Sequence, residues 1–321
     1  MIIQRSHLLL CTSLALAPIL ACDSETDEFR TGYYCPAWQC GYNTSEVNGK
    51  SIQDLNLDGV SNAAGVRIVD FTVPLSLIKY DLDTDGDALV ARPRSGFGPT
   101  LRGFSLVGSI IWIKVDGGPA IPVTIAGYDE VLSWAAGTPA MPAYALIYPD
   151  LDELVDRSIC KGTLVNPLQA AVIVLGGERY DNDTKTVIPD QDRWMTLACA
   201  GSAAAKMALL GYGPNGDFGG QGQAATADQR QATIKMLTSD LCGDGVSYTE
   251  DGTPLQWDNA GGTVVSEGEL GELEALWTSD GALCLDTPRL VDPEDVACQL
   301  PSCAGFDLDD AEWITHLPPA E

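Results

Sequence analysis

The chain has 321 residues, and its 45 acidic and 18 basic side chains give a formal net charge of −27 at pH 7. A surface this acidic repels nucleic acid and anionic lipid, and the sequence contains no run of basic residues that would offset the repulsion. The length allows one large or two small domains with a substantial core. Composition therefore argues against a nucleic-acid-binding protein.

The start of the chain predicts export. A short basic start precedes an apolar run at residues 8–20, which is too short to span a bilayer. The sequence ILAC at 19–22 resembles a bacterial lipobox, in which Cys22 is acylated and becomes the first residue. Ordinary secretory cleavage is the alternative, but it would put the bulky Ile19 where a small side chain is expected. We therefore expect residues 1–21 to be a lipoprotein signal peptide and the protein to be lipid-anchored in the bacterial cell envelope, in the inner or the outer membrane.

The mature chain divides into three parts by composition. Residues 22–34 contain an acidic run and are expected to form a solvated tether. Residues 35–150 are expected to form a β-rich region and residues 151–321 an α+β domain, with a connection near residues 149–169. The β-rich region consists of short strand-like runs separated by Gly, Pro and Asp-Gly turns, which favours an antiparallel sheet curled into a sandwich or small barrel. The runs lie at 66–71, 75–80, 87–92, 101–108, 110–115, 121–127 and 143–148.

Helices are predicted in the second half. A hairpin turning at Asn182 and Asp183 precedes an Ala-rich helix over residues 193–210. A second helix begins with a capping box formed by Thr226 and Gln229 and ends at Gly243. Shorter helices are expected at 269–277 and 293–299. The predicted fold class is α+β, with an N-terminal antiparallel β-rich part followed by a hairpin and a disulfide-stapled helix pair.

Eight cysteines remain once Cys11 leaves with the leader and Cys22 carries lipid. An even number in an oxidising compartment indicates disulfides, and the absence of C-x-x-C argues against a metal site. Short spacing favours the pairs Cys35–Cys40 and Cys298–Cys303. The other four allow three pairings, of which we favour one containing Cys199–Cys242, because it would join the two helices. The eight are Cys35, Cys40, Cys160, Cys199, Cys242, Cys284, Cys298 and Cys303.

One stretch resembles a known family. SDLCGDGVSYTEDGTPL (239–255), with QRQATIKML (229–237) before it, is similar to the signature of the ADYC-domain family. GERYDNDTKTV (177–187), LACAG (197–201), LWTSDGALCLDTPRL (276–290) and CPAWQCG (35–41) extend the resemblance over most of the mature chain. Ser239 and Leu241 replace the Ala and Tyr of the name-giving tetrapeptide. The resemblance implies a secreted or lipidated protein of Gram-negative bacteria and brings no activity with it.

Few residues are suited to catalysis. After removal of the leader, His316 is the single histidine, five residues from the end, where we expect a frayed tail. Ser202 and Lys206 are four apart, whereas serine–lysine hydrolases use S-x-x-K. The glycines at 211–216 match G-x-G-x-x-G but follow a helix, not a strand.

Two acidic loops show the spacing D-x-[DN]-x-D-G, which points alternate oxygens at one hard cation. Their twelfth positions lack the usual acid, so a full EF-hand is excluded, and polar hairpin turns explain the pattern equally well. We weigh a calcium site in the loop at residues 81–87 and, with less support, another in the loop at residues 54–59. The candidate calcium ligands are Asp81, Asp83, Asp85 and Asp87.

The sequence thus favours a non-catalytic binding or scaffolding module without a cofactor, whose partner is an unknown envelope protein or glycan. The alternative is an extracytoplasmic hydrolase that uses carboxylates beside the helix pair. Asp240 and Asp244, which flank Cys242, would be mutated first, although turn and cap hydrogen bonds also explain them. A pocket holding at least two carboxyl groups with raised pKa values would favour the hydrolase.

Overall fold

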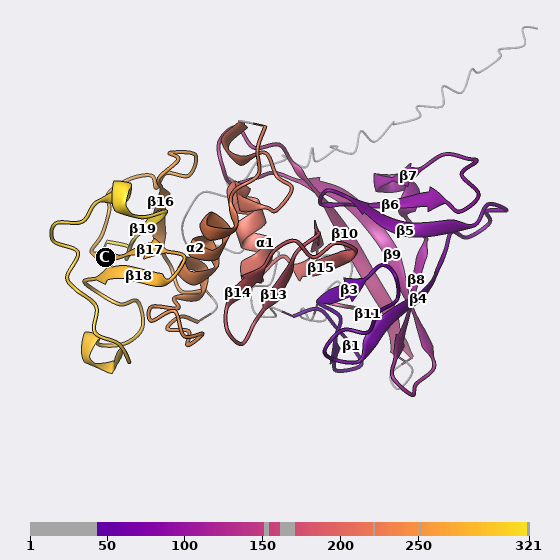
Figure 1. Ribbon diagram of the computed structural model, residues 1–321, viewed down its shortest axis with the longest axis horizontal. Helices are drawn as coiled ribbons and strands as arrows, with labels where there is room; N and C mark the ends of the chain where they lie inside the picture. Colours follow the sequence, from indigo (N-terminus) through magenta and orange to yellow (C-terminus); the bar gives the residue numbers. More distant parts are fainter. Residues whose placement is uncertain (1–43, 151–153, 161–170, 221, 251, 320–321) are drawn as a thin grey trace, which may run out of the picture.

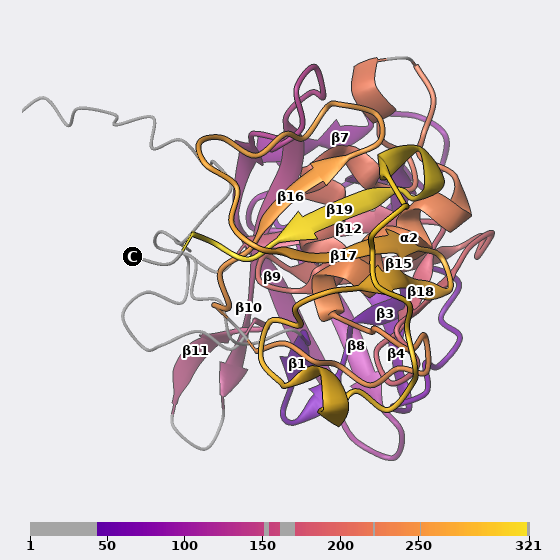
Figure 2. The same cartoon turned by 90° about the vertical axis from the view of Figure 1, so that its left-hand side faces the viewer.

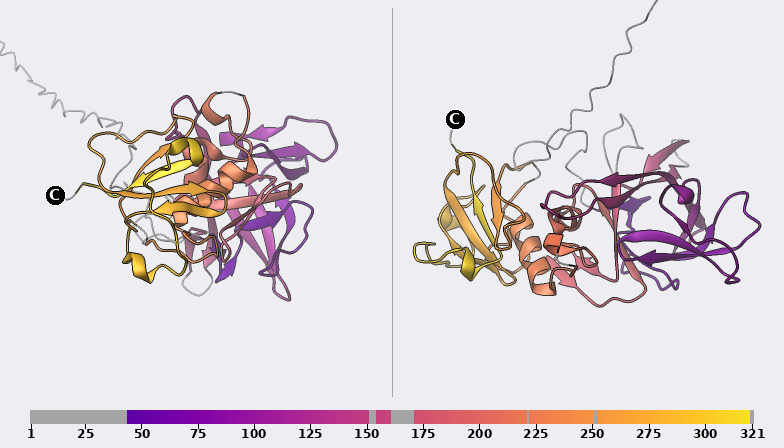
Figure 3. Two further views of the ribbon diagram at one scale, coloured as in Figure 1. Left: turned by 60° about the vertical axis from the view of Figure 1, so that its left-hand side comes forward. Right: turned by 90° about the horizontal axis from the view of Figure 1, so that it is seen from above.

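A computed structural model of the chain describes residues 44–150, 154–160, 171–220, 222–250 and 252–319 (Figure 1). The signal peptide, the tether, the lipidation site Cys22 and the cysteines Cys35 and Cys40 lie outside these residues. The described part has three layers, with a pair of helices between a large curled sheet and a smaller C-terminal sheet (Figures 1 and 3). Within it, no helix has both the length and the apolar character needed to cross a membrane.

The large sheet is antiparallel throughout. Its edges are β3 and β4, which follow one another in the sequence and contact each other, so the sheet is rolled into a half-barrel. Asn62 helps to hold the roll, because its amide donates to the carbonyl of Asp54 at 2.9 Å and accepts from the amide of Val66 at 2.9 Å. In order the strands are β3 (Asp54–Asn56), β15 (Trp194–Cys199), β12 (Ala171–Gly176), β10 (Met141–Asp150), β9 (Ala120–Val131), β8 (Ile110–Val115) and β4 (Val66–Thr72), with β11 (Val155–Ser158) also paired to β10.

A second, three-stranded sheet packs against the half-barrel. It consists of β5 (Tyr80–Asp85), β6 (Ala88–Pro93) and the short β7 (Leu101–Arg102), followed by the 3-10 turn Gly103–Leu106. Leu89 of β6 is fully buried, and its amide donates to the Tyr144 hydroxyl of β10 at 2.9 Å. The antiparallel sheet expected between residues 66 and 148 is therefore confirmed, although the large sheet also recruits strands from both flanking regions.

The outer face of β12 and β15 packs on the helices. α1 (Ala203–Met207) continues into a π-helical turn, Ala208–Tyr212, and α2 (Ala227–Thr238) crosses beside it. Ile173 and Leu175 of β12 point to this layer while Val172 and Val174 point into the half-barrel, so β12 is buried on both faces. Next to the helices, β13 (Arg179–Asp181) and β14 (Thr186–Ile188) form the expected hairpin.

The C-terminal sheet covers the far side of α2 (Figure 2). Its order is β16 (Gln256–Asn259), β19 (Trp313–His316), β17 (Leu273–Thr278) and β18 (Gly281–Leu285). Trp277 and Trp313 are fully buried against the helical layer. Short elements complete the fold, namely β1 (Glu46–Val47), β2 (Lys50–Ser51) and the 3-10 turns Phe218–Gly220, Pro293–Asp295 and Leu308–Asp310.

The predicted α+β fold class with a helix pair is wrong. The protein is mostly β-sheet, with 38% strand and 13% helix, and its two helices are short. The first third of the first predicted helix, residues 194–199, is strand β15, because its Thr and apolar residues are buried between two strands of the sheet. Residues 203–210 of that prediction are helical. The helix expected at 269–277 is largely strand β17, and that at 293–299 is one 3-10 turn. The second helix, α2, begins with the predicted capping box, in which Thr226 accepts from the amide of Gln229 at 3.2 Å, but it ends at Thr238 and not at Gly243.

Candidate functional site

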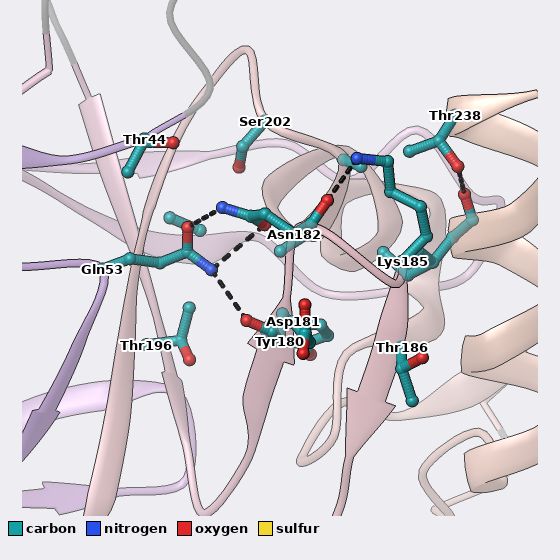
Figure 4. Close-up of a pocket in the computed structure, with 14 residues that line it drawn as sticks. Thr44, Gln53, Tyr180, Asp181, Asn182, Lys185, Thr186, Thr196, Ser202 and Thr238 are labelled. Carbon is teal, nitrogen blue, oxygen red and sulfur yellow. Dashed lines mark hydrogen bonds between the residues drawn. The ribbon is translucent and has the colours of Figure 1, made fainter. Parts of the chain in front are cut away.

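A polar pocket of about 140 Å³ lies where the half-barrel, the β13–β14 hairpin and the two helices meet (Figure 4). Residues that are far apart in the sequence form it, from Thr44 to Thr238. Five of the lining residues carry Ser or Thr hydroxyls, two carry amides, and one each carries an ammonium and a carboxylate group. The polar lining residues are Thr44, Thr186, Thr196, Ser202 and Thr238, Gln53 and Asn182, Lys185 and Asp181, together with Tyr180.

A pair of amides forms one wall of the pocket. Gln53, which is buried, donates through Nε2 to the carbonyl of Tyr180 and to Oδ1 of Asn182, both at 3.3 Å. Asn182 donates in return to Oε1 of Gln53, so the two amides face one another (Figure 4). Asn182 is exposed at the hairpin turn, and its amide therefore borders both the pocket and solvent. The pair presents donors and acceptors in fixed positions.

The charged groups of the pocket are engaged with the hairpin turn. Lys185 Nζ donates to the carbonyl of Asn182. Asp181 accepts from the amides of Thr184 at 3.0 Å and Asp183 at 2.9 Å. These hydrogen bonds, that from Thr184 above all, keep the pKa of Asp181 below its ordinary value. The carboxylate of the pocket is thus held ionised by the backbone of the turn.

Ser202 begins α1 and lies at the pocket. Its hydroxyl accepts from the amide of Ala205 at 3.1 Å, which makes Ser202 the N-cap of the helix. Lys206 lies four residues later in the last turn of α1, so its spacing from Ser202 differs from the S-x-x-K of serine–lysine hydrolases.

Three buried ion pairs anchor α2 to its neighbours. Arg230 donates to Glu178 next to β13 at 2.6 Å, and Lys235 donates to Asp240 at 2.6 Å. Arg289 donates to Glu274 of β17 at 2.6 Å and also to the carbonyl of Met236 in α2 at 3.2 Å. All six charged side chains are at most 9% exposed. The pairs connect the helix to the hairpin and to the C-terminal sheet.

The segment after α2 reverses the chain tightly. Ser239 takes the left-handed conformation at the helix C-cap, with φ 50°. Asp240 is fully buried, and its Oδ2 accepts from Lys235 and from the amide of Gly245 at 3.0 Å. Leu241 lies in the core, and Cys242 is bonded to Cys298. Each residue of the SDLC tetrapeptide therefore has a structural role.

The model of the ADYC domain family matches residues 103–291, which is more than half of the chain. The chain belongs to the ADYC-domain family. No curated protein and no solved structure matches it.

The position of the ADYC tetrapeptide explains what this chain keeps and what it changes. Asp240 and Cys242, which are kept, fasten the end of α2 through an ion pair and a disulfide. Leu241 stands at the tyrosine position and is 1% exposed in the helical core. Asp244 is exposed and accepts from the amide of Val246 at 3.1 Å, which is turn geometry. In this ADYC domain, Asp240 and Asp244 thus serve as cap and turn residues.

The described cysteines form three disulfides, Cys160–Cys199, Cys242–Cys298 and Cys284–Cys303. Disulfides were expected, but both predicted pairs that can be inspected are wrong. Cys199 of β15 points into the half-barrel, on the opposite side of the sheet from Cys242, so these two cannot meet. Cys298 is bonded to Cys242 just after α2, and Cys303 is bonded to Cys284 of β18, so Cys298 and Cys303 do not form a disulfide with each other.

The acidic loop predicted as a calcium site forms the β5–β6 hairpin. Three of its carboxylates pair with arginines: Asp81 with Arg94 at 2.8 Å, Asp83 with Arg92 at 2.7 Å, and Asp85 with Arg102 at 2.5 Å. Arg193 also bridges Asp83 to Asp58 of the second acidic loop. In the described residues, no three His, Cys, Asp or Glu side chains are grouped to hold a metal ion. The geometry does not favour calcium here, and its binding stays untested.

The fourth carboxylate, Asp87, has different surroundings. Its Oδ1 accepts from Asn215 at 2.8 Å and from the amide of Gly176 at 3.2 Å. Burial raises the pKa of Asp87 from 3.8 to about 6, against the effect of these hydrogen bonds. The folded state therefore binds this proton more tightly than the unfolded chain does, and Asp87 lowers stability as the pH rises from about 4 to about 6.

We expect Asp87→Asn to raise the free energy of unfolding at pH 7 by about 1–2 kcal/mol and to leave it unchanged at pH 4. The oxygen of the introduced amide can still accept the two hydrogen bonds, while the buried charge is removed. Urea denaturation at both pH values measures the effect, with Asp85→Asn as an exposed control in the same hairpin. Destabilisation that is larger at pH 7 than at pH 4 would contradict this and show that the ionised carboxylate is needed in the fold.

His316, expected in a frayed tail, lies instead in β19 at the centre of the C-terminal sheet. It is half-buried, and burial lowers its pKa. Its Nδ1 has no hydrogen-bond partner among the described atoms. His316 does not line the polar pocket. The sequence offered no signal for the pocket itself, since its lining residues are common polar types without a recognisable spacing.

Proposed function

We propose that this ADYC-domain protein is a lipid-anchored protein of the cell envelope that binds a small, neutral, hydroxyl-bearing molecule, such as a sugar unit of a glycan, without catalysis. The observation that carries the proposal is the composition of the polar pocket, which combines facing amides with several hydroxyl groups. Such groups pair with the alternating donors and acceptors of a sugar.

The size and charge of the pocket support this class of ligand. Its volume of about 140 Å³ is well above the space that one water needs, on the order of 10–15 Å³. Lys185 and Asp181 are both bonded to the hairpin turn, so neither is free to compensate a charged ligand. A neutral polar ligand would meet amide and hydroxyl groups without leaving a charge unpaired.

The proposed location rests on the lipobox-like sequence ending at Cys22 and agrees with the three disulfides. Disulfides persist in oxidising compartments such as the bacterial periplasm and are rare in the cytosol. Two of the three, Cys160–Cys199 and Cys242–Cys298, connect residues 39 and 56 positions apart, so they constrain the fold as a whole.

The carboxylate-dependent hydrolase receives no support from this pocket. Acid–base catalysis of that kind uses two carboxyl groups, one with a raised pKa. Asp181 is the one carboxylate that lines the described pocket, and its pKa is lowered. Asp87 and Glu312 have raised pKa values but do not line it; Glu312 accepts from Tyr212 and Gln229 in the helical layer.

Binding of mono- and disaccharides by the full chain, measured by titration calorimetry, tests the proposal. We expect Asn182→Ala to weaken binding about tenfold, because it removes hydrogen bonds worth roughly 1–1.5 kcal/mol. Gln53→Leu, which keeps the side-chain size, should weaken it similarly. Gln299→Ala, an exposed residue that does not line the pocket, is the matched control. Absence of saturable binding, or affinities that ignore Asn182 and Gln53, would refute the proposal.

A further inference from the structure

The two loops that flank β5 and β6 expose large apolar side chains. Leu75 and Leu77, between β4 and β5, are 106% and 103% exposed, and Phe97, between β6 and β7, is 84% exposed. Side chains this exposed make almost no contact with the rest of the protein. We call these three residues with Ile78 the loop tip. A grouped set of exposed apolar residues, unlike single ones, indicates an interaction surface.

The loop tip is one surface because its two loops are joined. The amide of Arg94 donates to the carbonyl of Lys79 at 2.8 Å, which continues the pairing of β5 and β6 beyond the strands. Gly98 packs so closely on Ile78 that a Cβ at this position would lie 2.9 Å from Cδ1 of Ile78. The apolar side chains are therefore displayed together by a β-hairpin framework.

Charge is distributed unevenly between the two ends of the molecule. Residues 66–115, which include the loop tip, contain six Lys or Arg and five Asp, a formal charge of +1. Residues 239–321, which include the C-terminal sheet, contain nineteen Asp or Glu and one Arg, a formal charge of −18. The β5–β7 sheet and the C-terminal sheet lie at opposite ends of the protein (Figures 1 and 3).

The cations near the loop tip keep its end of the molecule neutral. Arg92, Arg94 and Arg102 each pair with an aspartate of β5, so the carboxylates of that strand are compensated. Lys79 is exposed and directly follows the apolar residues of the first loop. Between residues 88 and 115 the chain has four Lys or Arg and no Asp or Glu. An anionic membrane surface, which repels the acidic remainder of the protein, therefore does not repel the end that carries the loop tip.

We propose that the loop tip docks on a phospholipid bilayer and orients the protein on the membrane, with the acidic C-terminal sheet pointing away. Leu, Ile and Phe side chains enter the boundary between headgroups and acyl chains, while Lys stays at the headgroups. Repulsion between the C-terminal sheet and anionic lipid favours the same orientation. This surface is distinct from the pocket. The 22 residues from Asp23 to Thr44 span at most roughly 75 Å, which leaves the anchored protein free to turn the tip toward the bilayer.

Depth-dependent quenching tests the docking. The full chain with Leu77→Cys, carrying an environment-sensitive dye, is placed on vesicles of equal parts phosphatidylcholine and phosphatidylglycerol with brominated acyl chains. Val265→Cys, a 59% exposed position between β16 and β17, is the matched control. We expect the bromines to quench the dye at position 77 at least twofold and to leave the dye at position 265 unquenched. Leu75→Ser with Phe97→Ser should abolish the quenching at position 77.

Three results would overturn the docking surface: equal emission at both positions, quenching that survives the double substitution, or a spectral shift at position 77 that grows with protein concentration without vesicles. The last would assign the loop tip to a second copy of the chain. Flotation of the protein with the vesicles tests the lipid anchor, and titration with sugars tests the pocket. Failure of either proposal can therefore be distinguished from failure of the docking by the loop tip. All substituted side chains are exposed, and circular dichroism verifies that each variant folds.

Discussion

Gly243→Ala is expected to lower the free energy of unfolding by more than about 4 kcal/mol, a large part of the roughly 5–15 kcal/mol that stabilises a typical domain. Gly243 follows the SDLC tetrapeptide and has φ 72°, a conformation that costs alanine about 1 kcal/mol. The added Cβ would lie 2.0 Å from the carbonyl oxygen of Asp280 and 3.0 Å from its carbon. Both contacts are with backbone, so the clash cannot be relieved by a side-chain rotation.

Gly262→Ala is the matched control, because Gly262 has φ 65° with nothing within 4 Å of an added Cβ. Its expected cost is about 1 kcal/mol, from the backbone conformation alone. Guanidinium denaturation of both variants with the disulfides intact gives the comparison. Similar losses in the two variants would mean that the chain after α2 can shift away from β18, and that the ADYC segment is not a rigid joint.

Glu178→Gln is expected to cost about 3–5 kcal/mol, because it leaves the Arg230 guanidinium buried without a counter-charge. Glu178 is 1% exposed, and its carboxylate accepts from Arg230 Nε at 2.9 Å and Nη2 at 2.6 Å. It also accepts from the Tyr180 hydroxyl. A glutamine keeps the shape but offers one acceptor and no charge, so the bidentate pair between the hairpin and α2 is lost.

Two further variants identify the cause. Asp81→Asn breaks an exposed pair with Arg94 and should cost less than about 1 kcal/mol. Glu178→Gln combined with Arg230→Met should recover part of the loss, since it removes the unpaired charge. Urea denaturation of the variants and the parent protein supplies the values. If the double variant were as unstable as Glu178→Gln alone, or more so, hydrogen bonding and packing, not the buried charge, would dominate at this site.

The sequence predicted the turns, helix caps and strands that depend on residues close together in the chain. Two predicted strand runs are wrong, since residues 75–79 form a loop before β5 and the run at 101–108 is the short β7 followed by a 3-10 turn. The capping box of Thr226 and Gln229, the hairpin turning near Asn182 and the other strand-like runs of the first half appear in the structure. Each depends on residues a few positions apart, so the sequence alone carries the information. The stretch at residues 229–255, with the shorter stretches that support it, was likewise enough to indicate the family, which the match over residues 103–291 confirms.

Long-range contacts decide what the sequence could not show. The stretch 194–199 has neighbours of high helix propensity, but pairing with β12 and β3 makes it a strand. The disulfides follow the same rule, because the side of the sheet on which Cys199 lies depends on that pairing. The pocket combines residues of the N-terminal strands, the hairpin and both helices, and no single segment contains its pattern.

The disulfides and β19 also show that the folding unit is longer than the part of the chain that the family shares. Cys242 and Cys284 lie within residues 103–291, whereas their partners Cys298 and Cys303 lie beyond them. β19, which separates β16 from β17, lies beyond them too. A recombinant fragment containing only residues 103–291 would therefore leave Cys242 and Cys284 without their disulfide partners and the C-terminal sheet without its β19 strand. Such a fragment would be prone to form non-native disulfides and to aggregate.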